Sequence, residues 1–286
     1  MINKSKESRN IEIKEFYNSS QAYLDRLNKH DELVFAPYVN LCKRYLPPGS
    51  SILDAGCGAG VSSSHLAKAG FRVIGIDVSA LFVAEGMRKY KEQEGLSFKV
   101  SDVAKMPFSS QSFDAVCSYD LLEHVINVKA VLTEMSRVVK KGGLLIILAS
   151  NHLNPVEHLK EVIKWQKQDV YKPWEAKSRF GALYKGIRTF FLAINKVLGL
   201  NKKIYYLEPV LSNNEGTCGR DFDATWLINW FDLENTLKEL GFSIKDTPAH
   251  CEDRIMRKMR TLRVPKAIQL FYLKMKLPCL IVGVNK

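Results

Sequence analysis

Three glycines, Gly56, Gly58 and Gly60, directly follow an apolar run that ends at Ala55. Glycine lets a backbone bend sharply and approach a ligand without a Cβ in the way. A helix that begins just after such a turn presents unpaired N–H groups to an anionic or carboxylate-bearing ligand. Residues 52–60 therefore predict a ligand-binding turn between a strand and a helix.

The spacing of these glycines separates two classes of nucleotide-like cofactor. A dinucleotide-binding turn has the pattern G-x-G-x-x-G. This chain has G-x-G-x-G, with Val61 where the third dinucleotide glycine would fall, which disfavours an NAD-dependent oxidoreductase. Asp77 ends the next apolar run about 20 residues later, where a carboxylate can accept both hydroxyls of a ribose. That acid is common to both classes and does not discriminate between them.

The elements that would position these residues alternate between strand and helix. Short, nearly continuous apolar runs predict strands at 51–55, 72–77, 97–101, 113–119 and 144–149. Helix-length stretches lie between them, near 61–69, 79–94 and 126–140. We expect the third helix to end in Lys140-Lys141-Gly142-Gly143, since cations and glycine mark helix C-termini. The alternation predicts an α/β fold with a doubly wound, mostly parallel sheet.

The flanking regions complete this sheet and decorate it. Helices are expected at 11–29 and 31–46, and helical patterns recur at 156–168 and 180–200. A helix at 225–240, a strand at 242–246, a basic helical segment at 251–276 and a strand at 279–284 follow. We therefore predict seven strands, with helical insertions after the fifth strand and before the last. The regions are N-terminal helices (1–50), a core (51–150), an insertion (151–222) and a C-terminal part that completes the sheet (223–286).

Five segments of the sequence follow one another along residues 52–147: ILDAGCGAG (52–60), VIGIDVS (73–79), SDVAKMPF (101–108), SFDAVCSYDLLEHV (112–125) and RVVKKGGLLII (137–147). In this order and at this spacing, they resemble class I S-adenosyl-L-methionine (SAM)-dependent methyltransferases. The resemblance is to the type 11 small-molecule group that includes ubiquinone and menaquinone biosynthesis enzymes, and it covers about a third of the chain. It implies the Rossmann-like methyltransferase fold, SAM as cofactor and a transferase activity.

The resemblance implies roles for the residues of the first two segments. Gly56, Gly58 and Gly60 would hold the methionine part of SAM. Asp54 would order that turn, and Asp77 would bind the ribose diol. The alternative for each acid is an ordinary helix cap or turn residue.

Five further residues would complete the cofactor pocket by the same resemblance. Val78 would pack against the adenine. Asp102 would accept a hydrogen bond from the adenine amine, with the backbone N–H of Val103 beside it. Tyr119 and Asp120 would line the side on which the methyl group is transferred, although Asp120 has a turn role as an equal alternative.

Glu123 and His124 follow the fourth strand, and the resemblance places them at the reactive end of the cofactor as candidate catalytic residues. Methyl transfer depends chiefly on aligning a nucleophile with the sulfonium methyl carbon. If the acceptor is a hydroxyl, a base that titrates near neutral pH helps to remove its proton, which suits His124. The alternative is that His124 only orders the cofactor loop.

The end of the fourth strand also bears on the acceptor. Residues 118–121 read Ser-Tyr-Asp-Leu, so the Asn/Asp-Pro-Pro-aromatic motif of enzymes that methylate base amines is absent, as is a Pro-Cys pair. Nucleic acid is therefore disfavoured as a partner despite the basic composition. The remaining alternative class is a non-catalytic SAM-binding module that recognises RNA or a protein partner.

The insertion after the fifth strand commonly forms the acceptor lid in the family that this chain resembles. Residues 180–198 place apolar side chains three and four apart with cations between them, and the C-terminal segment 254–276 adds further cations among apolar residues. Such a helix either packs on the core or lies in an anionic membrane interface. We expect a small-molecule or lipid-like acceptor, such as a quinone precursor or lipid-linked sugar, methylated on oxygen, with peripheral membrane contact.

The composition of the chain indicates the cellular compartment in which it works. The formal net charge is +12, and the last 36 residues hold nine Lys and Arg against two Asp and Glu. The six cysteines are scattered without a C-x-x-C pair, which argues against a disulfide scaffold or a metal site and for reduced thiols in a cytoplasm. No apolar run approaches the roughly 18 residues of a membrane span, and the first ten residues lack a secretory h-region. We expect a cytoplasmic protein.

Overall fold

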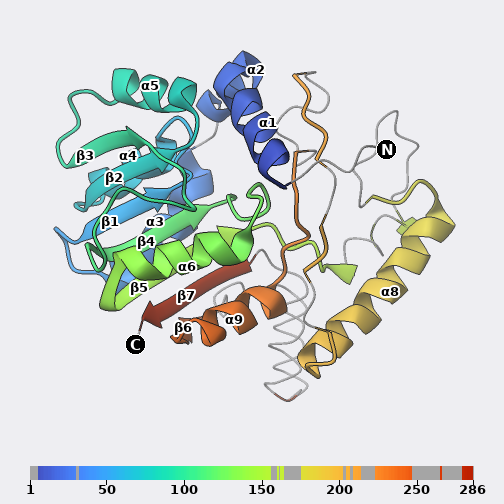
Figure 1. Cartoon of the computed structure of the whole chain (residues 1–286). Helices are drawn as coiled ribbons and strands as arrows, with labels where there is room; N and C mark the ends of the chain where they lie inside the picture. Colours follow the sequence, from blue (N-terminus) through green and yellow to red (C-terminus); the bar gives the residue numbers. More distant parts are fainter. Residues whose placement is uncertain are drawn as a thin grey trace.

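The computed structural model describes residues 6–29, 32–155, 160, 162–163, 175–201, 204–206, 209–213, 223–246, 265 and 279–285 (Figure 1). The basic segment expected at 251–276 lies outside the described residues except for residue 265. The helix expected at 156–168 lies mostly outside them.

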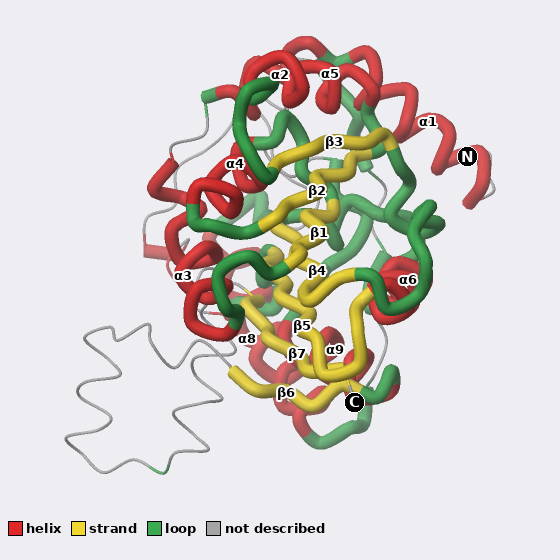
Figure 2. The backbone as a smooth tube through the Cα atoms, turned by 90° about the vertical axis from the view of Figure 1, so that its left-hand side faces the viewer, coloured by secondary structure: helices red, strands yellow, loops and turns green. Residues whose placement is uncertain are grey.

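Among the described residues, seven strands form one sheet in the order β3-β2-β1-β4-β5-β7-β6 (Figure 2). The first five strands pair in parallel, and β7 runs antiparallel to both β5 and β6. The predicted doubly wound, mostly parallel seven-stranded sheet is confirmed. The strands are β1 (Ser51–Ala55), β2 (Arg72–Asp77), β3 (Leu96–Val100), β4 (Phe113–Tyr119), β5 (Val139–Ala149), β6 (Phe242–Asp246) and β7 (Cys279–Asn285).

Several helices begin at a polar side chain that accepts a hydrogen bond from a backbone N–H of the first turn. Ser20 caps α2 in this way and ends the single helix expected at 11–29, which is two helices. Ser79, Asn127, Ser178 and Asn229 cap α5, α6, α8 and α9. The helices are α1 (Lys6–Ser19), α2 (Gln21–Asn28), the 3-10 turn η1 (Glu32–Phe35), α3 (Ala36–Tyr45), α4 (Val61–Lys68), α5 (Ala80–Lys89), α6 (Val128–Val138), α8 (Arg179–Val197) and α9 (Trp230–Glu239).

Several boundaries differ from the sequence prediction, and two of the differences have a clear structural cause. Helix α6 ends at Val138, and Lys140 to Gly143 belong to β5 rather than to a helix end. They form an irregularity where Phe113 pairs with Val139 but Ala115 pairs with Leu144. The helix expected from residue 225 begins only at Trp230, because residues 225 and 226 bind the loop after β4 instead.

The sheet is buried on both faces, which explains its continuous apolar strands. Alternate residues of β5 point to opposite faces: Ile147 packs with Trp230 of α9 on one face, and Ile146 packs with Tyr38 of α3 on the other. The polar residues that follow β1, β2 and β4 are therefore left at one open edge. In such sheets, ligands bind outside the carboxyl ends of the strands where the strand order reverses. Here that point lies between β1 and β4.

Candidate cofactor and acceptor site

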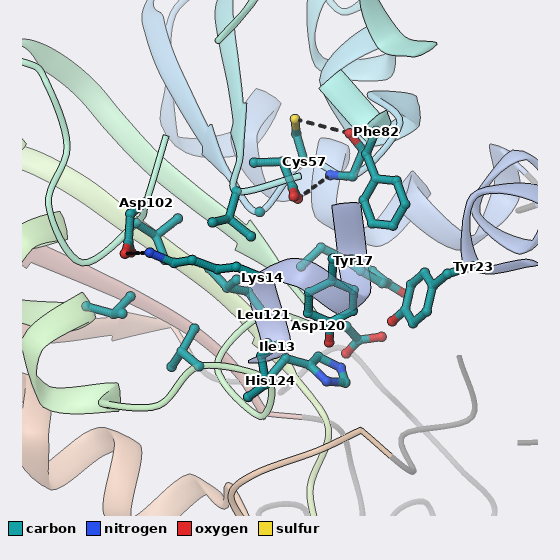
Figure 3. Close-up of a pocket in the computed structure, with 18 of the residues that line it drawn as sticks. Ile13, Lys14, Tyr17, Tyr23, Cys57, Phe82, Asp102, Asp120, Leu121 and His124 are labelled. Atoms are coloured by element: carbon teal, nitrogen blue, oxygen red, sulfur yellow. Dashed lines mark hydrogen bonds and ion pairs between the residues drawn. The ribbon is translucent and has the colours of Figure 1, made fainter. Parts of the chain in front are cut away.

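A cavity of about 520 Å³ lies at the carboxyl ends of β1, β2 and β4 (Figure 3). Its walls come from the turn after β1, the loops after β2, β3 and β4, and the N-terminal helices. This volume falls within the roughly 300–1,000 Å³ of sites for small molecules and cofactors. Of the predicted site residues, those that line it are Gly56, Gly58, Asp77, Val78, Asp102, Val103, Tyr119, Asp120 and His124.

The glycine turn forms the floor of this cavity. Gly56 and Gly58 have φ values of +75° and +53°, which favour glycine. A Cβ on Gly56 would lie 2.7 Å from Leu121 Cδ1, so any side chain there would displace Leu121. The bare backbone is thus exposed to a ligand.

Asp54 lies behind the turn rather than in the cavity. Its carboxylate accepts hydrogen bonds from Tyr38 Oη at 2.8 Å and from the Oγ atoms of Ser62 and Ser63 at 2.6 Å each. Burial raises the pKa of Asp54, and these three hydrogen bonds oppose the rise. Because Ser62 and Ser63 belong to the first turn of α4, Asp54 fixes that helix to β1.

Gly60 does not line the cavity either. It precedes α4 with φ +83°, and a Cβ there would overlap with Phe98 Cζ. Its lack of a side chain lets α4 pack closely against the sheet. The third glycine of the turn therefore has a packing environment that differs from that of the first two.

Gly60→Ala is expected to lower the free energy of unfolding by about 2–4 kcal/mol, since the methyl group overpacks against Phe98 in a left-handed backbone. Urea unfolding measures this. Gly142→Ala is the matched control, because Gly142 has φ +73° and a Cβ added to it would have nothing within 4 Å. Its expected cost is only the backbone penalty of about 1–2 kcal/mol. Equal losses in the two variants would contradict the packing role.

Asp77 projects into the cavity from the end of β2. Its Oδ2 accepts the N–H of Gly58 at 3.0 Å and its Oδ1 accepts the N–H of Ser79 at 2.9 Å. Burial raises the pKa of Asp77, and the N–H groups of Ser79 and Gly58 oppose the rise. A carboxylate has about four acceptor positions, so Asp77 keeps acceptor capacity for a ligand beside its bonds to backbone N–H groups.

Asp102 lies after β3 and is held from two sides. Its Oδ1 accepts the N–H of Ala104 at 2.8 Å, and its Oδ2 accepts Lys14 Nζ at 2.7 Å, the ion pair dashed in Figure 3. Lys14 comes from α1, whose cavity-lining residues recur three and four apart and so form one helix face. Those residues, which the sequence analysis did not identify, are Glu7, Asn10, Ile13, Lys14 and Tyr17.

The other end of the cavity is lined by Tyr119, Asp120 and His124 from the end of β4 and the loop that follows. Asp120 has φ +45°, uncommon for a residue other than glycine, and its N–H donates to Leu148 O at 2.8 Å. Tyr119 packs against Phe35 with ring centroids 4.8 Å apart. Burial, followed by the charges of Asp120 and Glu123, raises the pKa of Tyr119 to about 12. Its hydroxyl is therefore neutral at physiological pH.

His124 belongs to a buried group of polar side chains that come from distant parts of the sequence. Asp223 Oδ2 lies 3.3 Å from His124 Nδ1 and accepts a hydrogen bond from Tyr17 Oη at 2.5 Å. Burial alone raises the pKa of Asp223, but the charge and hydrogen bond of His124 and the hydrogen bond of Tyr17 outweigh it and lower the pKa to about 2. The group thus orients one ring nitrogen of His124 toward a carboxylate. Asp223 was not identified from the sequence.

Glu123 does not line the cavity. Its side chain is fully buried, and its Oε1 accepts the N–H of Ser150 at the end of β5 at 3.1 Å. Its carbonyl accepts the N–H of Thr225 at 2.6 Å, and Trp226 Nε1 donates to Val125 O at 2.8 Å. These contacts fix the loop that carries His124 and bring residue 223 beside it.

The depressed pKa of Asp223 makes its contribution to stability depend on pH. The contribution is complete above the ordinary value of 3.8 and is lost as the pH falls through about 2. The difference in unfolding free energy between the native protein and Asp223→Asn is therefore expected to shrink by about 1 kcal/mol between pH 5 and pH 3. Denaturant titrations at both pH values measure it. A difference that grows toward pH 3 would contradict the pairing.

A family model described as a methyltransferase domain matches residues 53–147, which contain the turn after β1 and strands β2 to β5 up to Ile147. Residues 53–147 form a class I SAM-dependent methyltransferase domain. In the described part of the chain, no group of three or more His, Cys, Asp or Glu side chains is placed to hold a metal ion beside this methyltransferase domain.

Curated relatives resemble this methyltransferase domain and its flanks. A protein named demethylmenaquinone methyltransferase from Thermobifida fusca is 35% identical over 45% of this chain and 55% of its own length. A ubiquinone biosynthesis O-methyltransferase from Methylocella silvestris is 34% identical over 46% of this chain and 51% of its own length. The chain spans about half the length of these relatives.

Solved structures share the fold of the methyltransferase domain and of the elements around it. Magnesium protoporphyrin IX methyltransferase from Synechocystis PCC 6803, solved with S-adenosylhomocysteine (SAH), superposes with a TM-score of 0.55 at 16% identity. The likeness covers 96% of this chain and 99% of that one. A putative SAM-dependent methyltransferase from Listeria monocytogenes gives 0.53 at 15% identity, over 90% and 100% of the two chains.

The cavity of the methyltransferase domain fits SAM by its own chemistry. Gly56 and Gly58 leave bare backbone where a Cβ would meet Leu121 or Leu27, which suits an amino-acid moiety lying against the turn. Asp77 retains acceptor capacity for the two hydroxyls of a ribose. Asp102 and Val103 form the wall beyond it.

Proposed function

We propose that this protein is a SAM-dependent methyltransferase whose acceptor is a small, lipid-like molecule methylated on oxygen, such as a quinone precursor or a lipid-linked sugar. The observation that carries the proposal is the continuity of the site. One cavity joins the glycine turn and Asp77 to a second end lined by Tyr17, Asp120 and His124. A cofactor and an acceptor can therefore meet within a single cavity.

The cofactor half of the site holds its ligand by backbone and carboxylate groups. Asp77 binds the ribose hydroxyls, Val78 packs against the adenine, and Asp102 accepts a hydrogen bond from the adenine amine. Lys14 keeps Asp102 oriented, and the N–H of Val103 lies beside it in the wall of the cavity. When bound, SAM supplies an electrophilic methyl group that moves from its sulfur to the acceptor oxygen.

The acceptor half aligns the nucleophile and takes its proton. Tyr119 and Asp120 form the wall next to the reacting atoms. His124 accepts the proton of the acceptor hydroxyl on the ring nitrogen that does not face Asp223. Asp223 is a positioning residue, because it acts through the imidazole that it faces. Tyr17 in turn holds Asp223 through the hydrogen bond that its hydroxyl donates. The negative charge of Asp223 favours the protonated imidazole that this transfer produces.

The lipid-like acceptor is supported by the walls of the cavity and by the relatives. Apolar side chains from the N-terminal helices, η1, α5 and α6 line much of the space. The relatives are named as enzymes of menaquinone and ubiquinone biosynthesis. We place the enzyme in the cytoplasm, in peripheral contact with the membrane that holds such an acceptor. The apolar residues are Ile13, Leu27, Phe35, Phe82 and Val131.

Incubation with methyl-labelled SAM and a hydroquinone bearing a short prenyl tail tests this proposal. We expect labelled product with the methyl group on oxygen, located by fragmentation mass spectrometry. The same hydroquinone with its hydroxyls already methylated is the control and should stay unlabelled. A product methylated on carbon would overturn the oxygen assignment. Absence of any labelled product over a panel of hydroxylated lipids and sugars would overturn the proposed activity.

A further inference from the structure

Helix α8 packs against the body of the protein with its small side chains and leaves its large apolar ones outside. The buried positions are Ala182, Gly186, Ala193 and Lys196. The exposed fractions of Phe180, Tyr184 and Phe191 are 87%, 66% and 59%. We define the outer face of α8 as the exposed apolar residues Phe180, Leu183, Tyr184, Ile187, Phe190 and Phe191. A helix that served the core would have the opposite arrangement.

A buried ion pair holds α8 in this orientation. Lys196 Nζ lies 2.6 Å from both carboxylate oxygens of Asp232 in α9, and both side chains are almost fully buried. Asn229 Nδ2 donates to Asp232 at 2.6 Å, and Ala193 packs with Leu153 and Phe231. Breaking a buried pair is costly, so α8 does not roll its apolar stripe inward readily. Figure 1 shows α8 at the margin of the molecule beside α9.

The charge on α8 indicates what covers its outer face. The 19 residues of the helix contain no Asp or Glu, while Arg179 and Arg188 are exposed on it. The chain as a whole has a net charge of +12. Cations beside a stripe of Phe, Tyr, Leu and Ile match an anionic lipid surface, where acyl chains take the apolar side chains and headgroups take the charges.

We propose that the outer face of α8 docks the protein on an anionic membrane, with the helix lying in the plane of the interface. No helix among the described residues is long and apolar enough to cross a bilayer. The biological role of this docking rests on the proposed function, since a membrane docking face would bring the enzyme to a lipid-like acceptor. The docking itself is measured without any methyl transfer.

Flotation of the full chain with lipid vesicles tests the docking. At low salt we expect binding to phosphatidylcholine vesicles that contain roughly one-third phosphatidylglycerol, and at least about tenfold weaker binding to phosphatidylcholine alone. The triple variant Phe180→Ser, Tyr184→Ser, Phe191→Ser should lose at least about tenfold in binding to the anionic vesicles. Met87→Ser is the matched control, because Met87 is 47% exposed on α5, and it should bind as the native chain does.

Three results would overturn the docking proposal. The native chain could ignore anionic vesicles at low salt, or the triple variant could float as the native chain does. The outer face could instead prove to be a self-association surface, seen in light scattering as a native dimer without lipid that the variant converts to a monomer. Thermal melting and SAH binding by the variant confirm that it is folded. Methyl transfer to a soluble acceptor without vesicles reports on the proposed function separately.

Discussion

Asp77→Ala is expected to weaken the binding of SAH about 100-fold. The carboxylate keeps acceptor capacity beside its bonds to backbone N–H groups, and each hydrogen bond to a charged group is worth about 1.5–3 kcal/mol. Loss of two ribose contacts then removes about 3 kcal/mol, which corresponds to roughly two orders of magnitude in Kd. Isothermal titration calorimetry with SAH measures the change directly.

The control for this variant is Asp114→Ala. Asp114 lies in β4 and binds Ser51 and Lys140, at the end of the sheet opposite the cavity. Its replacement should leave the affinity for SAH unchanged. Because Asp77 also accepts the N–H of Gly58, circular dichroism and thermal melting must show that Asp77→Ala is folded. A folded Asp77→Ala protein that binds SAH as tightly as the native chain would refute the ribose role.

His124→Ala is expected to lower kcat by about 10²–10⁴-fold, the usual contribution of a positioned general base. The affinity for SAH should stay within about threefold of the native value, since the imidazole is assigned to the proton of the acceptor. The pH–rate profile of the native enzyme should have an acid limb that His124→Ala lacks. Single-turnover assays with the prenylated hydroquinone separate the chemical step from product release.

Asp223→Asn gives a second measurement of the same group. The amide keeps the size of the side chain but removes the charge that faces His124 Nδ1. We expect a smaller loss in kcat than for His124→Ala, with a displaced acid limb in the pH–rate profile. Full turnover by His124→Ala, with unchanged affinity for SAH, would mean that the histidine only orders its loop. That result would leave the assignment of the cofactor pocket unchanged and would remove His124 as the general base.

The strands were predictable because burial on both faces leaves a simple pattern. Residues 51–55, 72–77 and 113–119 were identified with the boundaries that the structure has. The break between α1 and α2 was missed because Ser20 fits either a helix surface or a cap, and only its hydrogen bond to the N–H of Tyr23 decides. Lys140 to Gly143 have the composition of a helix end, but their place in β5 depends on pairing with β4.

The resemblance assigned Asp77, Asp102 and Asp120 to one site, and the structure places all three in the lining of one cavity. The carboxyl ends of parallel strands share one edge, which explains why these residues come together. Lys14 and Asp223 could not be assigned from the sequence. Lys14 lies 88 residues before its partner Asp102, and Asp223 lies 206 residues after its partner Tyr17. No local sequence pattern encodes contacts over such separations.

The orientation of α8 shows a further limit. Periodicity identified an apolar stripe between 180 and 198 but left open whether it faces the core or a membrane interface. The packing face is instead the side with Ala182, Gly186 and Ala193, and Lys196 is fixed there by Asp232, which lies 36 residues away. The aromatic stripe therefore does not pack against the core of the protein. The vesicle experiment tests whether a membrane covers it.

A crystal structure of the SAH complex tests the central assignment most directly. We expect SAH in the cavity with its ribose hydroxyls on Asp77, its adenine between Val78 and Asp102, and its sulfur toward Asp120 and His124. Density for SAH outside this cavity, or a reversed ligand with its adenine at His124, would contradict the assignment.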